Sequence, residues 1–263
     1  MRNSLLIVGL MQKDSGKTTI SKAISRFYRD LKVGYAKPVS SFNAWFNYDI
    51  FEVGLNQGML ISGDILKMNE FVEDIVRSNP ICIMMSPVDP KKVEWSSVGY
   101  DSYYNQISLL RAIDRHYLIE SNLKNFPDFV NERIKEFLLK TNVETISLEE
   151  FEKIVEKARK ISDRFLNETR RKNDLTVIES TSNVASPNWS ALHSDCVILV
   201  SPGRVAIIDA ERYRSAIDLM GTDPWNLTTE SIVELLKPEM TFPTEPKKFN
   251  DEIFKKISEI LDV

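Results

Sequence analysis

A loop of small and polar residues near the N-terminus has the composition needed to bind a phosphate group. It covers residues 9–19, GLMQKDSGKTT, between a short apolar run and a stretch with helical spacing. Gly16 would let the backbone approach an anion, Lys17 supplies a cation, and the Thr18 hydroxyl can ligate Mg²⁺. Met11 stands where the strict pattern GxxxxGK[ST] has its first glycine, so the loop is a variant of that pattern. It predicts nucleotide binding through Asp14, Ser15, Gly16, Lys17, Thr18 and Thr19.

Two further charged residues follow apolar runs that read as strands. Glu179 follows residues 175–178, and Lys37 follows residues 33–36. Because ligands bind at the carboxyl ends of parallel strands, both side chains are expected beside the phosphate loop. There Glu179 can hold Mg²⁺ directly or through water, and Lys37 can pair with a phosphate or an anionic substrate. By pattern alone, Lys37 is a surface lysine as often as not.

An alternation of strands and helices would position these residues. Four all-apolar runs predict strands buried on both faces, at residues 5–8, 33–36, 175–178 and 196–200. Helical spacing predicts helices at residues 18–30, 207–219 and 251–261. We therefore expect an α/β fold of the P-loop NTPase kind, with an open, mostly parallel sheet and helices on both faces.

The middle of the chain differs from this frame. Between residues 95 and 172 no convincing strand is found, but three helical patterns are, at residues 102–122, 127–140 and 148–170. The last pattern follows Ser147 and Glu150, which are spaced as a capping box. We predict a helical insertion, 95–172, in a nucleotide-binding domain made of 1–94 and 173–263.

The insertion carries apolar stripes that must be buried, either on the frame or on a second copy of the chain. We expect a homodimer. Whether the insertion is a lid, a dimer contact or a partner site stays open at this point.

Composition excludes several classes of protein. The 263 residues are 43% apolar and 27% charged, which is typical of a globular protein and not of a fibrous or disordered one. With 34 basic and 38 acidic residues the net charge is −4, so we expect no nucleic-acid or membrane partner. Cys82 and Cys196 form no CxxC pair, and no apolar run approaches ~20 residues. We expect a cytoplasmic protein.

Five short motifs occur in a fixed order along the frame, from residue 5 to about residue 219. They are Gly16-Lys17-Thr18, Lys37-Pro38-Val39 with Ser41, Gly63-Asp64-Ile65-Leu66, Asn79-Pro80 with Ser86-Pro87, and Val177-Ile178-Glu179. In this order the chain resembles dethiobiotin synthetase and its relatives among the MinD-type P-loop ATPases.

The resemblance implies roles for particular residues. Thr18, Asp64 and Glu179 would surround Mg²⁺, Lys17 and Lys37 would contact phosphate groups of ATP, and Asp14 would occupy an acidic position of the loop. In that family ATP phosphorylates a carboxylate or carbamate, and a nitrogen nucleophile then captures the mixed anhydride.

The chain also departs from the family. Residues 180–183 replace a glycine-rich turn after the glutamate, and residues 203–210 replace a helix start with an Asn-His pair that helps bind substrate. These changes argue against the biotin-pathway substrate. Asn226 is a weak counterpart of the residue that recognises the base, so the choice between ATP and GTP stays open.

Two functions follow from these observations. One is a Mg²⁺- and ATP-dependent ligase or kinase acting on a small carboxylate, which Lys37 and Asp64 favour. The other is a MinD-like nucleotide-dependent switch acting on a protein partner, which the altered turn and the insertion favour. Lys13 lies four residues before Lys17, whereas the MinD group has its second loop lysine five residues before.

Histidines and aromatic residues give weaker signals. His116 and His193 are isolated and are expected at the surface or in the core. The aromatic residues of segment 45–48 either pack in the core or form a substrate wall.

Overall fold

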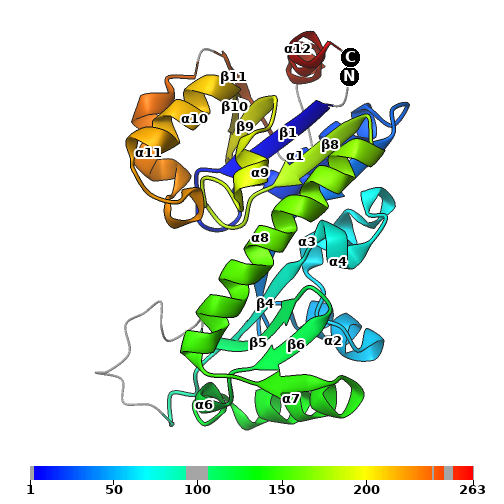
Figure 1. The fold of residues 1–263 in the computed structure, drawn as a ribbon, viewed down its shortest axis with the longest axis vertical. Helices are drawn as coiled ribbons and strands as arrows, with labels where there is room; N and C mark the ends of the chain where they lie inside the picture. The colour runs from blue at the N-terminus through cyan, green and yellow to red at the C-terminus, as the bar shows by residue number, and fades with distance from the viewer. Residues whose placement is uncertain (1–2, 93–105, 239, 246–250, 263) are drawn as a thin grey trace. The chain divides into compact units, whose positions relative to one another are not determined.

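The computed structural model describes residues 3–92, 106–238, 240–245 and 251–262 (Figure 1). The chain divides into two compact units. Unit 1 consists of Met1–Pro38, Lys67–Ser78 and Lys160–Val263, and unit 2 consists of Val39–Leu66 and Asn79–Arg159. These boundaries differ from a division at residues 94/95 and 172/173, because strands 39–43 and 81–86 belong to one sheet with strands from the middle of the chain.

Unit 1 is built on a six-stranded mixed sheet in the order β11-β10-β9-β1-β8-β2. The strands are β1 (Asn3–Gly9), β2 (Val33–Ala36), β8 (Leu175–Glu179), β9 (Cys196–Ser201), β10 (Arg204–Asp209) and β11 (Met240–Pro243). The four neighbouring strands β9, β1, β8 and β2 are parallel to one another. Strand β10 is antiparallel to both of its neighbours, β9 and β11. The four predicted strands are confirmed as β1, β2, β8 and β9.

One predicted helix of unit 1 begins too early. Residues 207–209 were expected to be helical, but they end strand β10, and helix α10 begins at Ala210. The four residues from Val205 to Ile208 are all buried, whichever face of the sheet they point to. A continuous apolar run of this kind fits a strand or a helix equally well, so periodicity did not separate the two.

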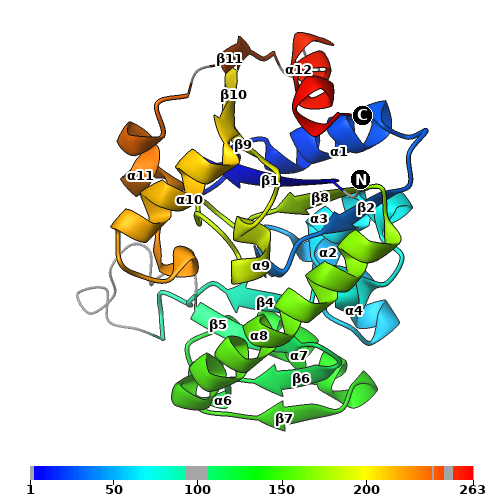
Figure 2. The ribbon, with the colours of Figure 1, turned by 45° about the horizontal axis from the view of Figure 1, so that its top comes forward.

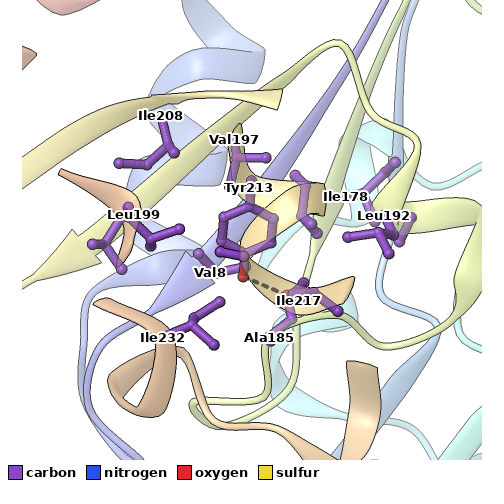
Figure 3. Close-up of a cluster of buried hydrophobic side chains, with 14 of the residues drawn as sticks. Val8, Ile178, Ala185, Leu192, Val197, Leu199, Ile208, Tyr213, Ile217 and Ile232 are labelled. Carbon is purple, nitrogen blue, oxygen red and sulfur yellow. Dashed lines mark hydrogen bonds between the residues drawn. The ribbon is translucent and has the colours of Figure 1, made fainter. Parts of the chain in front are cut away.

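One face of this sheet is covered by the C-terminal part of α8 (Leu148–Lys172) together with α9 (Trp189–Leu192), α10 (Ala210–Leu219) and α11 (Thr229–Leu236) (Figure 2). The buried cluster on this face joins Val8 and Val197 of the strands to Tyr213 and Ile232 of the helices (Figure 3). The Tyr213 hydroxyl donates to the main-chain oxygen of Ala185 at 2.7 Å. The only polar tip in the drawn cluster is therefore satisfied.

The other face is covered by α1 (Lys17–Phe27) and α12 (Asp251–Leu261) (Figures 1 and 2). The Tyr28 hydroxyl, just after α1, donates to the main-chain oxygen of Phe254 at 2.8 Å. Phe27 stacks on Phe254 with ring centroids 4.4 Å apart. Shorter segments complete the unit: η1 (Asn69–Phe71), α4 (Ile75–Ser78) and η3 (Pro224–Asn226).

Unit 2 is built on a five-stranded mixed sheet in the order β3-β4-β5-β6-β7. The strands are β3 (Val39–Asn43), β4 (Ile81–Ser86), β5 (Gln106–Ala112), β6 (Arg115–Leu118) and β7 (Val143–Thr145). The pairs β3–β4 and β6–β7 are parallel, and β5 is antiparallel to both of its neighbours. Its helices are α2 (Tyr48–Gln57), α3 (Gly63–Lys67), α6 (Glu120–Leu123), α7 (Asp128–Lys140) and the N-terminal part of α8.

The prediction that residues 95–172 contain only helices is wrong where the structure describes them. The predicted helix 102–122 is replaced over residues 106–118 by strands β5 and β6, while its first residues, 102–105, lie outside the described part. Apolar side chains of β5 are buried against helices on both faces of the sheet, in two separate clusters. A strand buried on both faces loses the alternation that distinguishes it from a helix.

Two other predictions for this segment are confirmed. The patterns at 127–140 and 148–170 are helices α7 and α8. The capping box is formed, because Ser147 N donates to Glu150 Oε2 at 2.8 Å and Glu150 N donates to Ser147 Oγ at 3.2 Å. The fold is thus α/β, but with two mixed, partly parallel sheets in place of one mostly parallel sheet. None of the helices in the described ranges is long and apolar enough to cross a membrane.

Candidate functional site

The loop between β1 and α1 has a defined, partly strained backbone. Gly16, immediately before α1, has φ 90°, and Asp14 has φ 56°. Positive φ costs a residue with a side chain free energy, and Asp is one of the few types that tolerate it. The Ser15 hydroxyl donates to Met11 O at 2.7 Å and accepts from Met11 N at 3.2 Å. These bonds close the loop on itself before the helix begins.

Lys17 is buried and lies across the end of β1. Its Nζ donates to the main-chain oxygen of Ser182 at 2.5 Å. A Cβ atom added at Gly9 would lie 2.9 Å from Lys17 Nζ and 2.6 Å from Ser15 Oγ. Any larger residue at position 9 would therefore displace the Lys17 ammonium and the Ser15 hydroxyl. Position 9, although outside the strict motif, therefore requires glycine because the Lys17 and Ser15 side chains fill the space of a Cβ atom.

Glu179, the last residue of β8, is the centre of a buried polar cluster and is only 1% exposed. Its Oε1 accepts from Lys37 Nζ at 2.6 Å and from Thr18 Oγ1 at 2.9 Å. Its Oε2 accepts from Tyr35 OH at 2.8 Å and from Ser21 Oγ at 3.2 Å. A buried carboxylate needs a counter-charge and hydrogen-bond donors, and Lys37 and the three hydroxyl groups supply both.

The turn after Glu179 lies against the loop between β1 and α1. Ser182 has φ 49°, its hydroxyl donates to Gln12 O at 3.0 Å, and its carbonyl accepts from Lys17. Ser180 N donates to Ile7 O at 2.9 Å, which continues the pairing of β8 with β1 into the turn. The turn after β8 thus binds the Lys17 ammonium through its Ser182 carbonyl.

The structure joins three of the predicted site residues, all in unit 1: Thr18, Lys37 and Glu179. Lys17, next to Thr18 in the chain, bonds the Ser182 carbonyl instead. Asp14, Ser15 and Gly16 form the loop, and Thr19 is exposed in the first turn of α1. Asp64 lies in the first turn of α3 and belongs to unit 2. Its convergence with Thr18 and Glu179 on one ion stays a prediction.

Sequence reasoning missed two residues of the cluster, Tyr35 and Ser21. A signal for each was present. Tyr35 is two residues before Lys37, and alternate residues of a strand face the same side. Ser21 is three residues after Thr18, and residues at that spacing share one face of a helix. The contact between Lys17 and Ser182 had no such signal, because it depends on the conformation of the turn after β8.

The donor set suits a hard divalent cation. A hydroxyl and a carboxylate oxygen are ligands that Mg²⁺ accepts, and Mg²⁺ usually keeps several waters, so Thr18 and Glu179 would be sufficient protein ligands. Within the described ranges no group of three or more His, Cys, Asp or Glu side chains is placed to hold a metal. Thr18 and Glu179 are therefore the two predicted metal ligands whose oxygens lie close together in unit 1.

His116, Cys82 and Cys196 are buried and have packing roles. His116 is buried in unit 2, where its Nε2 accepts from Leu60 N at 3.2 Å. Burial, with a smaller effect of the Arg111 charge, lowers the pKa of His116 to about 4. Cys82 and Cys196 are free and buried, and burial raises the pKa of Cys196 to about 12. None of these groups has the exposure or charge state expected of a nucleophile at neutral pH.

No protein-family model and no curated protein matches this chain. Its function has to be inferred from the geometry of the cluster around Glu179.

Proposed function

We propose that unit 1 is a P-loop nucleotide-binding domain that binds ATP with Mg²⁺ and phosphorylates or ligates a small carboxylate, as dethiobiotin synthetase-like enzymes do. The observation that carries this proposal is the Glu179 carboxylate, which accepts hydrogen bonds from both the Thr18 hydroxyl in the first turn of α1 and the Lys37 ammonium just after β2. In a simple solvated turn these side chains would point into water. Here the hydroxyl, the ammonium and the carboxylate meet at the ends of the neighbouring strands β1, β8 and β2.

The charge around the loop suits a polyphosphate. Helix α1 has 11 residues and no acidic residue in its first turn, so its N-terminus presents unopposed N–H groups to an anion. Lys17 and Lys37 add two positive charges beside it, and Glu179 subtracts one. The local balance is positive, although the whole chain carries −4.

Magnesium would be held by the Thr18 hydroxyl and the Glu179 carboxylate, with waters and phosphate oxygens completing its shell. When bound, it would neutralise charge on the phosphate groups during transfer. The Thr18 and Glu179 side chains are already 2.9 Å apart, so the site needs little rearrangement to offer both oxygens.

Lys37 is the residue that favours transfer to an anionic acceptor over nucleotide binding alone. Its ammonium reaches the same oxygen of Glu179 as the Thr18 hydroxyl, but from the segment after β2 and not from α1. A cation there would screen the repulsion between the terminal phosphate and an incoming carboxylate. A carboxylate oxygen would attack the γ-phosphorus, and the bond from that phosphorus to the oxygen bridging to the β-phosphate would break. ADP would be the leaving group, and the product would be an acyl phosphate. A nitrogen nucleophile could then displace phosphate.

Calorimetric titration of the full chain with ATP, with Mg²⁺ and with EDTA, tests the proposal. We expect Lys17→Ala to lower the affinity for ATP at least 100-fold, because it removes the loop cation, while the melting temperature changes little. The matched control is Lys13→Ala, since Lys13 is an exposed lysine of the same loop and should keep wild-type affinity. Equal ATP binding by wild type and Lys17→Ala would refute the loop assignment.

A screen of small carboxylates for carboxylate-dependent ADP release tests the transfer reaction. Lys37→Met should lose this turnover while retaining most of the ATP affinity. Because this variant leaves the Glu179 charge unpaired, its melting temperature must be measured alongside. If Lys37→Met folds and keeps full turnover, Lys37 has no role in transfer.

The contact between Lys17 and Ser182 favours a second function, the MinD-like switch. A phosphate group would compete with the Ser182 carbonyl for the Lys17 ammonium, so the turn would change conformation when nucleotide binds. Hydrogen exchange of Val184 N, which donates to Thr181 O at 3.0 Å, reports on this turn. Faster exchange with ATP than with ADP would support a switch. Identical exchange in both states would leave the enzyme as the better proposal.

A further inference from the structure

The two oxygens of the Glu179 carboxylate have different surroundings. Oε1 accepts from Thr18 Oγ1 and from Lys37 Nζ, and Thr18 is only half-buried, in the first turn of α1 beside the loop. Oε2 accepts from Tyr35 OH at 2.8 Å and from Ser21 Oγ at 3.2 Å, and both of these residues are 0% exposed. One oxygen therefore faces the loop, and the other faces the core of unit 1.

The sheet places Tyr35 where it can reach Oε2. Tyr35 lies opposite Val177 in the parallel pairing of β2 with β8, and Glu179 is two residues further along β8. Because alternate residues of a strand face the same side, the Tyr35 and Glu179 side chains share one face of the sheet. Both ends of the hydrogen bond are thus anchored on neighbouring strands. Rotation of the carboxylate would deprive the buried hydroxyl of this acceptor, which costs free energy.

The donors at Oε2 differ in kind from those at Oε1. Lys37 supplies the counter-charge, and its ammonium lies 2.6 Å from Oε1. The donors at Oε2 are neutral hydroxyl groups, so they add no charge. What they add is a fixed orientation of the carboxylate plane. A cation that approached from the loop would meet one carboxylate oxygen, because the second is held by Tyr35 and Ser21.

We infer that Tyr35 is a positioning residue that limits Glu179 to one metal-binding oxygen and thereby makes the site selective for Mg²⁺ over Ca²⁺. Mg²⁺ demands octahedral geometry, keeps several waters and takes few protein ligands, whereas Ca²⁺ takes about six to eight oxygens and accepts both oxygens of one carboxylate. A hydroxyl and a single fixed carboxylate oxygen suit the smaller ion. The inference rests on the proposed function of unit 1, in which a divalent cation binds there together with ATP.

Tyr35→Phe tests the inference, because it removes the hydroxyl, keeps the ring and frees Oε2 from its shorter hydrogen bond. The full chain is titrated calorimetrically with ATP in the presence of Mg²⁺, of Ca²⁺ or of EDTA. We expect the wild type to bind ATP about tenfold more tightly with Mg²⁺ than with Ca²⁺, and Tyr35→Phe to lose most of this preference, the effect of about one hydrogen bond to a charged group. A loss of packing alone would lower both affinities equally and leave their ratio unchanged.

The matched control is Tyr28→Phe. Tyr28 is also buried in unit 1, and its hydroxyl donates to Phe254 O at the same distance of 2.8 Å, but it lies at the other end of α1 from Thr18. Both variants should lower the melting temperature by similar amounts, and only Tyr35→Phe should change the ratio of the two affinities. Ser21→Ala should keep most of the preference, because the shorter bond from Tyr35 remains.

The outcomes separate this inference from the proposed function. If the wild type needs Mg²⁺ to bind ATP tightly but Tyr35→Phe has the same ratio of affinities, the inference is wrong and the proposed function stands. If the wild type does not bind ATP, or binds it equally well with either ion and in EDTA, the proposed function fails and the inference fails with it. Should Tyr35→Phe not fold, the wild type alone decides, since tight binding of ATP with equal affinity in Mg²⁺ and Ca²⁺ would overturn the inference.

Discussion

Each compact unit buries a charged side chain, and the two are partnered in different ways. Glu179 in unit 1 ends a strand, beside an exposed loop, and its partners are side chains. Arg111 in unit 2 is also fully buried, but it lies inside strand β5. Its guanidinium donates to the main-chain oxygens of Leu60, Ile113 and Asn79 at 2.8, 3.0 and 2.7 Å, and to one side-chain oxygen, Asn79 Oδ1, at 3.1 Å.

If unit 1 has the function that we propose, the difference separates structural burial of charge from functional burial. Main-chain carbonyls cannot leave their segments, so Arg111 ties three parts of unit 2 together permanently. The side chains around Glu179 can rotate toward a ligand that offers better partners. Burial of a charge is thus not a sign of a site by itself. Position at a strand end and partners that can be exchanged are what favour a site.

The largest expected effect tests the structural half of this comparison. Arg111→Met should lower the free energy of unfolding by roughly 3–5 kcal/mol, because several buried carbonyls lose a charged donor at once. Urea denaturation measures it. ATP affinity of the folded protein should stay at the wild-type value. A loss of stability below about 1 kcal/mol would mean that the guanidinium is replaceable.

The next prediction tests the functional half. Thr18→Val keeps the shape of the side chain but removes the hydroxyl that reaches Glu179. We expect the gain in ATP affinity from Mg²⁺ to fall roughly 30-fold, about 2 kcal/mol, while binding in EDTA stays unchanged. Ser21→Ala is the control, because Ser21 donates to the other carboxylate oxygen, further along α1. Equal losses in both variants would reduce the role of Thr18 to supporting Glu179.

The third prediction concerns another buried group of unit 2, His116, and the pH dependence of the free energy of unfolding. His116 accepts from Leu60 N and therefore stays neutral in the folded state, with its pKa lowered to about 4 from 6.5. Between those values the unfolded chain binds more protons, so stability is fully present above pH 6.5 and is lost as the pH falls toward 4. We expect a loss of roughly 1–2 kcal/mol between pH 7.5 and 5.

Urea denaturation at the two pH values, compared with His116→Gln, checks this prediction. The glutamine can still accept a hydrogen bond but does not titrate, so its stability should depend less on pH. A variant with the wild-type pH dependence would assign the acid sensitivity to other groups.

The same comparison explains what the sequence could reveal. Two apolar strands of the site end at charged residues, since β2 is followed by Lys37 and β8 ends in Glu179. Their ends could be located because the change from apolar to charged is abrupt. Lys37 and Glu179 were expected at one sheet edge for that reason, whereas Tyr35 and Ser21 were missed although strand and helix periodicity carried a signal for each.

Unit 2 offered no such boundaries. In β5 the apolar residues run without alternation, and Arg111 among them has the appearance of a charged residue on a helix surface. That guanidinium is buried because it bonds the carbonyls of Asn79 and Leu60, which lie 32 and 51 positions earlier in the chain. Contacts of this range are set by the fold, so neither the strand nor its buried charge could be predicted locally.

The smallest expected effect concerns the loop backbone. Asp14 is exposed and has φ 56°, a conformation that Asn tolerates and that costs Ala about 1 kcal/mol. Asp14→Ala should therefore lower the free energy of unfolding by about 1 kcal/mol, and Asp14→Asn by no more than a few tenths. Asp30, an exposed aspartate of unit 1 without positive φ, is the control, and Asp30→Ala should be neutral.

Nucleotide affinity of the same variants separates charge from conformation. Asp14→Asn removes a negative charge from a loop that we propose binds phosphate, so ATP should bind up to about threefold more tightly at low salt and equally at high salt. Asp14→Ala removes the same charge but also strains the loop, so it should gain less. If Asp14→Asn weakens ATP binding, the carboxylate contacts the ligand or its metal, and the acidic position implied by the family resemblance has a direct role.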